Sequence, residues 1–160
     1  MDIIDLTGEQ AMRLDAQLCF ALHAASRAFD GVYRVLLREF GLTYPQYLVL
    51  LVLWEHGELS VKNLGAKLRL DSGTLSPLLK RLEAAGWVER RRAVDDERSV
   101  VVSLTEAGGA LKERIMQVRT GVGVAIGMNQ EEADALRTRL VELTRSLDDT
   151  TAGLAAAAAR

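Results

Sequence analysis

Residues 70–104 read LDSGTLSPLLKRLEAAGWVERRRAVDDERSVVVSL, and this stretch decides the fold. In its first half, leucines recur three and four residues apart, which places them on one face of a helix. They are Leu75, Leu78, Leu79 and Leu82. The opposite face is small, hydroxylated and basic, and it carries Gly73, Ser76, Pro77 and Lys80, flanked by Thr74 and Arg81. The pattern predicts an amphipathic helix that ends at Gly86.

Pro77 limits where this helix can begin. Proline has no N–H group and is tolerated in the first turn of a helix. We therefore place the helix start between Ser72 and Thr74, with Asp71, Ser72 or Thr74 as the capping residue. Any amphipathic surface helix has a polar outer side, so this helix alone does not indicate a function.

The residues after the helix predict a β-hairpin. The first strand follows Gly86, the tip is polar, and the returning strand alternates Val100, Val102 and Leu104 with other residues. The tip carries Asp95, Asp96, Glu97 and Arg98. A helix followed at once by such a hairpin is the winged helix-turn-helix arrangement. In it the helix enters the major groove of DNA and a wing arginine enters the minor groove.

The charge distribution agrees with a local DNA-binding surface. Residues 60–100 contain nine Lys/Arg and six Asp/Glu, a net charge of +3. The whole chain is −2, so the remainder carries −5. Basic charge confined to one segment of a protein is typical of one face directed at DNA.

The stretches LDSGTLSPLLKRLEAAGWVER and DDERSVVVSLTEAG resemble the recognition helix and wing of the MarR family of bacterial transcriptional regulators. That resemblance implies a mainly α fold with a small β wing, and a homodimer built on N- and C-terminal helices. The residues that would face the major groove are Ser72, Thr74, Ser76, Lys80 and Arg81. Arg98 would enter the minor groove, with Asp96 holding it in place.

The whole chain, residues 1–160, reads as a single domain. Residues 43–104 form the winged helix-turn-helix region, with Thr43 and Ser60 as helix caps. We predict dimerisation helices in 12–40, with one helix over 12–39, and in 105–155. The glycines of 121–127 indicate a junction between helices, and a leucine stripe from Leu136 to Leu154 favours a partner subunit. A two-fold dimer implies an inverted-repeat operator with half-sites about 34 Å apart.

Composition excludes several classes of protein. No apolar run approaches the roughly 18 residues of a membrane helix and no signal-peptide pattern is present, so we expect a cytoplasmic protein with no membrane partner. The single cysteine, Cys19, cannot form an internal disulfide, and the two histidines are isolated. We expect no metal, no cofactor and no enzymatic activity.

Two further stretches, QLCFAL and LTYPQYLVLLVLWE, resemble the organic-hydroperoxide-sensing repressors within the MarR family. In that group an N-terminal cysteine is the sensor and tyrosines donate hydrogen bonds to its sulfur, which by likeness assigns Cys19, Tyr33 and Tyr44. Cys19 and Tyr33 lie 14 residues apart, about 21 Å along one helix, so they cannot touch within one subunit. The resemblance implies that the first helices of two subunits pack antiparallel, which would bring Tyr33 of one subunit to Cys19 of the other. With one cysteine, the oxidised sulfur would form a mixed disulfide with a low-molecular-weight thiol.

His23, one turn after Cys19, departs from the resemblance, which implies an aromatic residue at this position. It would donate to the thiolate, act as a cation beside it, or be solvated, and the sequence does not choose among these.

Two other functions compete with the peroxide sensor. One is a MarR-type repressor gated by a non-covalent phenolic ligand, with Cys19 incidental. The other is a thiol peroxidase. The peroxidase is disfavoured because no arginine or threonine neighbours Cys19 as such a site requires, and because it leaves the basic wing unexplained.

Overall fold

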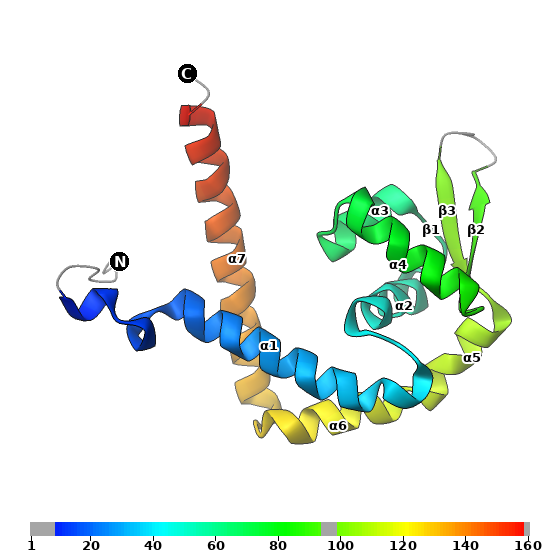
Figure 1. Ribbon diagram of the computed structural model, residues 1–160, viewed down its shortest axis with the longest axis horizontal. Coiled ribbons are helices and arrows are strands. Elements are labelled where there is room, and N and C mark those ends of the chain that lie inside the picture. The colour runs from blue at the N-terminus through cyan, green and yellow to red at the C-terminus, as the bar shows by residue number, and fades with distance from the viewer. Residues whose placement is uncertain (1–8, 94–98, 159–160) are drawn as a thin grey trace. The chain divides into compact units, whose positions relative to one another are not determined.

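The computed structural model describes residues 9–93 and 99–158. The chain divides into two compact units, residues 1–122 and 123–160, and each is described by itself. Short 3₁₀ turns occupy Glu9–Met12, Leu14–Ala16 and Arg38–Phe40. The α-helices are α1 (Leu18–Leu36), α2 (Tyr44–His56), α3 (Val61–Leu68), α4 (Ser72–Ala84), α5 (Glu106–Arg114), α6 (Met116–Ile126) and α7 (Gln130–Ala158) (Figure 1).

The first unit contains a winged helix-turn-helix. Helices α3 and α4 pack against each other and against α2, and β2 (Val88–Arg92) follows α4 directly (Figure 1). Strand β3 (Val100–Leu104) pairs antiparallel with β2, so that Val88 lies opposite Leu104 and Arg92 opposite Val100. The predicted fold class, mainly helical with a small β wing, is confirmed. The sheet has one strand more than predicted, because β1 (Leu59–Ser60) pairs with the other edge of β3.

Apolar side chains from α2, α3, α4 and the wing form one core. Of the four leucines predicted on the inner face of α4, Leu75, Leu79 and Leu82 are at most 1% exposed, and Leu78 is half-buried. Other buried apolar residues of these elements are Leu50, Leu53, Leu64, Val88 and Val102. This shared core orients the outer face of α4 and the wing together.

Local hydrogen bonds define both ends of α4. Asp71 is the cap: its Oδ1 accepts from the backbone N–H of Thr74 at 2.8 Å, and its Oδ2 accepts from the Thr74 hydroxyl at 3.0 Å. At the other end Gly86 adopts φ +77°, and the N–H of Trp87 donates to the carbonyl of Leu82 at 3.0 Å. A left-handed glycine with this bond stops a helix. The predicted start and end of α4 are therefore confirmed.

The position of Pro77 was predicted wrongly. It lies inside α4, in the second turn rather than the first. Proline cannot donate to the carbonyl four residues earlier, which is that of Gly73. Both residues are exposed, so solvent can reach that carbonyl, and the helix continues through Pro77. The packing of the leucine face in the core keeps α4 helical although this one backbone hydrogen bond is missing.

The first long helix is shorter than predicted. It begins at Leu18 and not at Met12, because Gln17 has an extended backbone and its side chain donates to the carbonyls of Ala11 and Arg13. It ends at Leu36 and a 3₁₀ turn completes the segment to Phe40. Helix α2 begins as predicted, with the Thr43 N–H donating to the Gln46 side chain at 2.8 Å. Ser60 caps α3 as predicted and accepts from the Asn63 N–H at 3.1 Å.

The glycine segment 121–127 is not a helix junction over most of its length. Gly121 and Gly123 lie within α6, and only Gly127, with φ +66°, marks a helix end. Gly121 packs against the side chain of Leu36, where a Cβ would come within 2.9 Å of Cδ2. This glycine therefore serves close packing rather than a turn.

In the second unit, a capping box marks the start of α7. Asn129 accepts from the N–H of Glu132 at 3.0 Å, and the Glu132 carboxylate accepts from the N–H of Asn129 at 2.9 Å, which forms a capping box. The leucine stripe of α7 is exposed at Leu136, Leu140, Leu147 and Leu154. Dimerisation through this stripe stays a prediction. Within the described residues, no helix combines the length and apolarity needed to cross a bilayer.

Candidate DNA interface and cysteine site

The outer side of α4 presents all five residues predicted to face DNA. Each of them is exposed: Ser72, Thr74, Ser76, Lys80 and Arg81. They divide into two edges, because Ser72 and Ser76 are turned toward the wing and Thr74 and Arg81 lie on the other side of the helix. The Thr74 hydroxyl is held by Asp71, so Thr74 serves the helix cap as well as the surface.

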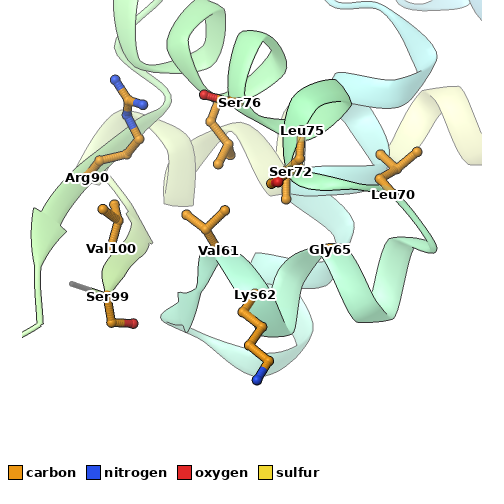
Figure 2. A pocket seen from close by; sticks show the side chains of 11 residues that line it. Val61, Lys62, Gly65, Leu70, Ser72, Leu75, Ser76, Arg90, Ser99 and Val100 are labelled. Atoms are coloured by element: carbon orange, nitrogen blue, oxygen red, sulfur yellow. The ribbon is translucent and has the colours of Figure 1, made fainter. Parts of the chain in front are cut away.

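A groove of about 780 Å³ lies between α3, α4 and the wing (Figure 2). Polar and basic side chains from all three elements line it. They are Lys62 of α3, Ser72 and Ser76 of α4, and Arg90 and Ser99 of the wing. Lys62, Arg90 and Ser99 were not singled out in the sequence, because only the packing of α3 and the wing brings them beside α4. Lysine and hydroxyl side chains in this arrangement suit the phosphates of a DNA strand.

Two wing arginines, Arg90 and Arg91, form ion pairs with glutamates. Arg90 contacts Glu83 with Nε at 2.9 Å and Nη2 at 2.5 Å from Oε2, and Arg91 contacts Glu58 at 2.5 Å. The hydrogen bond from Arg90 lowers the pKa of Glu83 below its ordinary value. Asp96 and Arg98, assigned to the minor groove, lie outside the described residues. Their role stays a prediction.

Cys19 lies in the first turn of α1 with its thiol free, and the residue is exposed. His23, one turn later, is also exposed. The two lie on the same face of α1, because residues four apart are neighbours on a helix surface. Among the described residues, no group of three His, Cys, Asp or Glu side chains is placed to hold a metal ion.

The two tyrosines assigned to the sensor come together, but away from the cysteine. The rings of Tyr33 and Tyr44 stack with centroids 4.2 Å apart, and Tyr47 lies 5.8 Å from Tyr33. Burial raises the pKa of Tyr33 to about 12, with smaller contributions from Tyr44 and Tyr47. Burial also raises the pKa of Tyr44, helped by the charge of Asp30. Both hydroxyls therefore stay protonated and remain hydrogen-bond donors at neutral pH.

Within one chain the cysteine cannot use these donors. Cys19 and Tyr33 belong to the same continuous helix, α1, and 14 residues of helix span about 21 Å. The described residues thus contain a thiol near one end of α1 and, near its other end, a donor pair formed by Tyr33 of α1 and Tyr44 of α2. A second antiparallel α1 would bring each thiol beside the other chain's donors.

A family model described as transcriptional regulator SarA/Rot matches residues 31–115. The chain is 50% identical over 146 residues to the HTH-type transcriptional regulator TtmR of Methylorubrum extorquens strain PA1, covering 91% of this chain and 75% of that one. It is 48% identical over 126 residues to the organic hydroperoxide resistance transcriptional regulator of Bacillus subtilis strain 168, covering 79% and 84%.

Solved structures agree with these relatives. Reduced AbfR bound to DNA is similar with a TM-score of 0.75 at 39% identity, over 88% of this chain and 96% of that one. A cysteine-substituted Escherichia coli MarR bound to operator DNA is similar with a TM-score of 0.71 at 26% identity, over 79% and 92%. These proteins are regulators rather than enzymes. The chain belongs to the MarR family of winged helix-turn-helix transcriptional regulators.

Proposed function

We propose that this regulator is a homodimeric repressor that binds an inverted-repeat operator and releases it when an organic hydroperoxide oxidises Cys19. The observation that carries the proposal is the layout of α1. An exposed thiol stands at one end of the helix, and a stacked pair of protonated tyrosines at the other. The site is incomplete in one chain, and an antiparallel pair of α1 helices would complete it twice.

The surroundings of the thiol suit an organic oxidant. Large apolar side chains of α1 are exposed near Cys19, among them Leu18 at 53% and Phe20 at 42%. An apolar rim favours the alkyl part of an organic hydroperoxide over hydrogen peroxide. The tyrosine hydroxyls of the second chain would donate to the thiolate, which is the reactive form.

The chemistry proceeds in two steps. The thiolate sulfur attacks the terminal oxygen of the hydroperoxide, the O–O bond breaks, and protonation yields a sulfenic acid and an alcohol. A low-molecular-weight thiol then attacks the sulfenic sulfur, which gives a mixed disulfide and releases water. The new group at Cys19 is larger than a thiol and sits where the two chains would meet, so it changes the spacing of the two α4 helices.

The release mechanism follows from that spacing. A two-fold dimer places two α4 helices in successive major grooves about 34 Å apart, with the wings in the flanking minor grooves. Any change in the distance between the α4 helices uncouples one half-site without altering a DNA-contacting residue. The similarity to a regulator named for organic hydroperoxide resistance and to DNA-bound AbfR supports both halves of the proposal.

The test is fluorescence anisotropy on a duplex selected from a random pool by the reduced protein. Wild type and Cys19→Ser are titrated with cumene hydroperoxide. The proposal expects wild type to leave the duplex at stoichiometric peroxide while Cys19→Ser stays bound. Release of both, or of neither, would overturn the redox mechanism. Release by a phenolic acid with equal effect on both proteins would favour the ligand-gated alternative instead.

A further inference from the structure

Glu83 is an unexpected residue on the outer side of α4. It follows Ser76 and Lys80 at spacings of seven and three residues, so all three lie along one edge of the helix, where Ser76 lines the groove beside the wing. DNA phosphates repel a carboxylate, and the rest of this edge is hydroxylated or basic. A carboxylate at this position should weaken DNA binding, unless its charge is paired with a cation and stabilises the structure.

The structure shows what Glu83 contacts. Its Oε2 accepts two hydrogen bonds from Arg90, from Nε at 2.9 Å and from Nη2 at 2.5 Å. The two side chains are only partly exposed, Arg90 at 29% and Glu83 at 36%. Charge-assisted bonds that use two nitrogens of a guanidinium fix orientation as well as distance.

The strand register shows which face of β2 carries Arg90. Arg90 lies opposite Val102 of β3, whose side chain is fully buried on the inner face of the sheet. Arg90 therefore belongs to the face of β2 that looks toward α4, where it lines the groove with Ser76 and Val100 (Figure 2). The chain reverses at Gly86 between α4 and β2, so the Glu83–Arg90 pair spans the two arms of that turn.

We propose that the Glu83–Arg90 ion pair sets the position of the wing relative to α4, and that Glu83 is a positioning residue for DNA recognition. In the proposed function, the wing and the recognition helix contact neighbouring grooves at the same time, so the angle between β2 and α4 limits specific binding. Non-specific binding to phosphates does not need that angle. The inference rests on the DNA-binding half of the proposed function and is independent of Cys19.

The proposal predicts a change opposite in sign to that of simple electrostatics. If Glu83 only repelled phosphates, Glu83→Gln would tighten binding to every duplex. If it positions the wing, Glu83→Gln weakens binding to the selected duplex roughly tenfold, since a dimer loses the pair twice, and leaves non-specific binding within about twofold.

The experiment compares Glu83→Gln, Arg90→Gln and the double variant on the selected duplex and on poly(dI-dC), at several salt concentrations. Each single variant should lose the same selectivity, and the double variant should lose no more than either one, because both remove a single interaction. The salt dependence of binding should stay that of wild type. The charge-exchanged variant, Glu83→Arg with Arg90→Glu, should recover most of the selectivity.

Glu89→Gln is the matched control. It removes a carboxylate from the opposite face of the same strand, where Glu89 accepts from the Ser103 hydroxyl, and should leave selectivity unchanged. Thermal melting of every variant verifies folding. Tighter binding by Glu83→Gln would overturn the proposal. So would a salt dependence reduced in Arg90→Gln alone, which would assign Arg90 to a phosphate. If wild type enriches no duplex from the random pool, the proposed function fails as well.

Discussion

The ring of Tyr33 stacks on the ring of Tyr44 at 4.2 Å and 26°, and this contact joins the last turns of α1 to the first turn of α2. Helix α2 in turn packs against α3 and α4. A displacement of the tyrosine pair would therefore be transmitted through α2 to both α3 and α4. This contact connects the proposed sensor to the DNA-binding surface within one chain.

Removing one hydroxyl tests the tyrosines as donors. Tyr33→Phe keeps the stacked ring and loses the O–H group. DNA binding should be unchanged, and peroxide-triggered release should slow on the order of tenfold, because a hydrogen bond to a charged sulfur is lost. The measurement is the time course of anisotropy after adding cumene hydroperoxide. Tyr47→Phe, in the same cluster, is the control and should react like wild type. Equal rates for Tyr33→Phe and wild type would remove Tyr33 from the sensor.

The raised pKa of Tyr33 predicts an alkaline limit to stability. Burial raises the pKa of Tyr33 to about 12 in the folded chain, against 10.0 for an ordinary tyrosine. Between these values the unfolded chain has lost the proton and the folded chain has kept it, so stability falls as pH rises through this window. Tyr33→Phe should flatten that fall. Urea unfolding across the alkaline range, followed by circular dichroism, tests this. An identical fall in the variant would contradict it.

Much of the DNA-binding half was predictable from sequence because its signals are local. Leucines at helical spacing predicted the inner face of α4, and Gly86 predicted its end. The caps at Thr43, Ser60 and Asp71 rest on bonds within three residues, so they too are local.

Features that depend on tertiary contacts were missed. Strand β1 has two residues and exists only because β3 offers an open edge. Gly121 looked like a junction because its packing partner, Leu36, is distant in sequence. The pairing of Glu83 with Arg90 could not be predicted without the strand register. The position of Pro77 in the second turn could not be predicted without knowing that core packing keeps α4 helical. The tyrosine pair was identified by resemblance, but its stacking was not foreseen.

Two neighbouring glycines in α5 should respond oppositely to alanine. A Cβ on Gly108 would lie 2.0 Å from the backbone carbonyl oxygen of Trp87, whereas one on Gly109 would meet nothing within 4 Å. Gly108→Ala should cost at least about 3 kcal/mol of unfolding free energy. Gly109→Ala should stabilise the protein by up to about 1 kcal/mol through helix propensity. Urea denaturation measures both. Similar midpoints for the two variants would refute the close approach at Gly108.

Thr105 joins three segments through one hydroxyl. Its oxygen accepts from the Gly108 N–H at 3.0 Å, and its proton is donated to the Gly86 carbonyl at 2.6 Å. Thr105→Ala should reduce the unfolding free energy by about 1 kcal/mol or more, because it removes both the cap of α5 and the hydrogen bond to the Gly86 carbonyl, just after α4. Thr105→Ser retains the hydroxyl and should cost less than half as much. Equal losses in the two variants would mean that the methyl group, and not the hydroxyl, stabilises this junction.

Lys80 should contribute to DNA affinity mainly through phosphates. It is exposed on the outer face of α4, one turn from Ser76, and no ion pair to it is present among the described residues. Lys80→Gln should weaken binding to all duplexes alike and reduce the slope of log affinity against log salt by about 2 per dimer, since each lost cation frees roughly one counterion less. Lys112→Gln, on α5, removes the same charge away from α4 and should leave the slope unaltered. Fluorescence anisotropy at five salt concentrations would separate the two. A Lys80→Gln protein that loses affinity only for the selected duplex would instead place this lysine on a base edge.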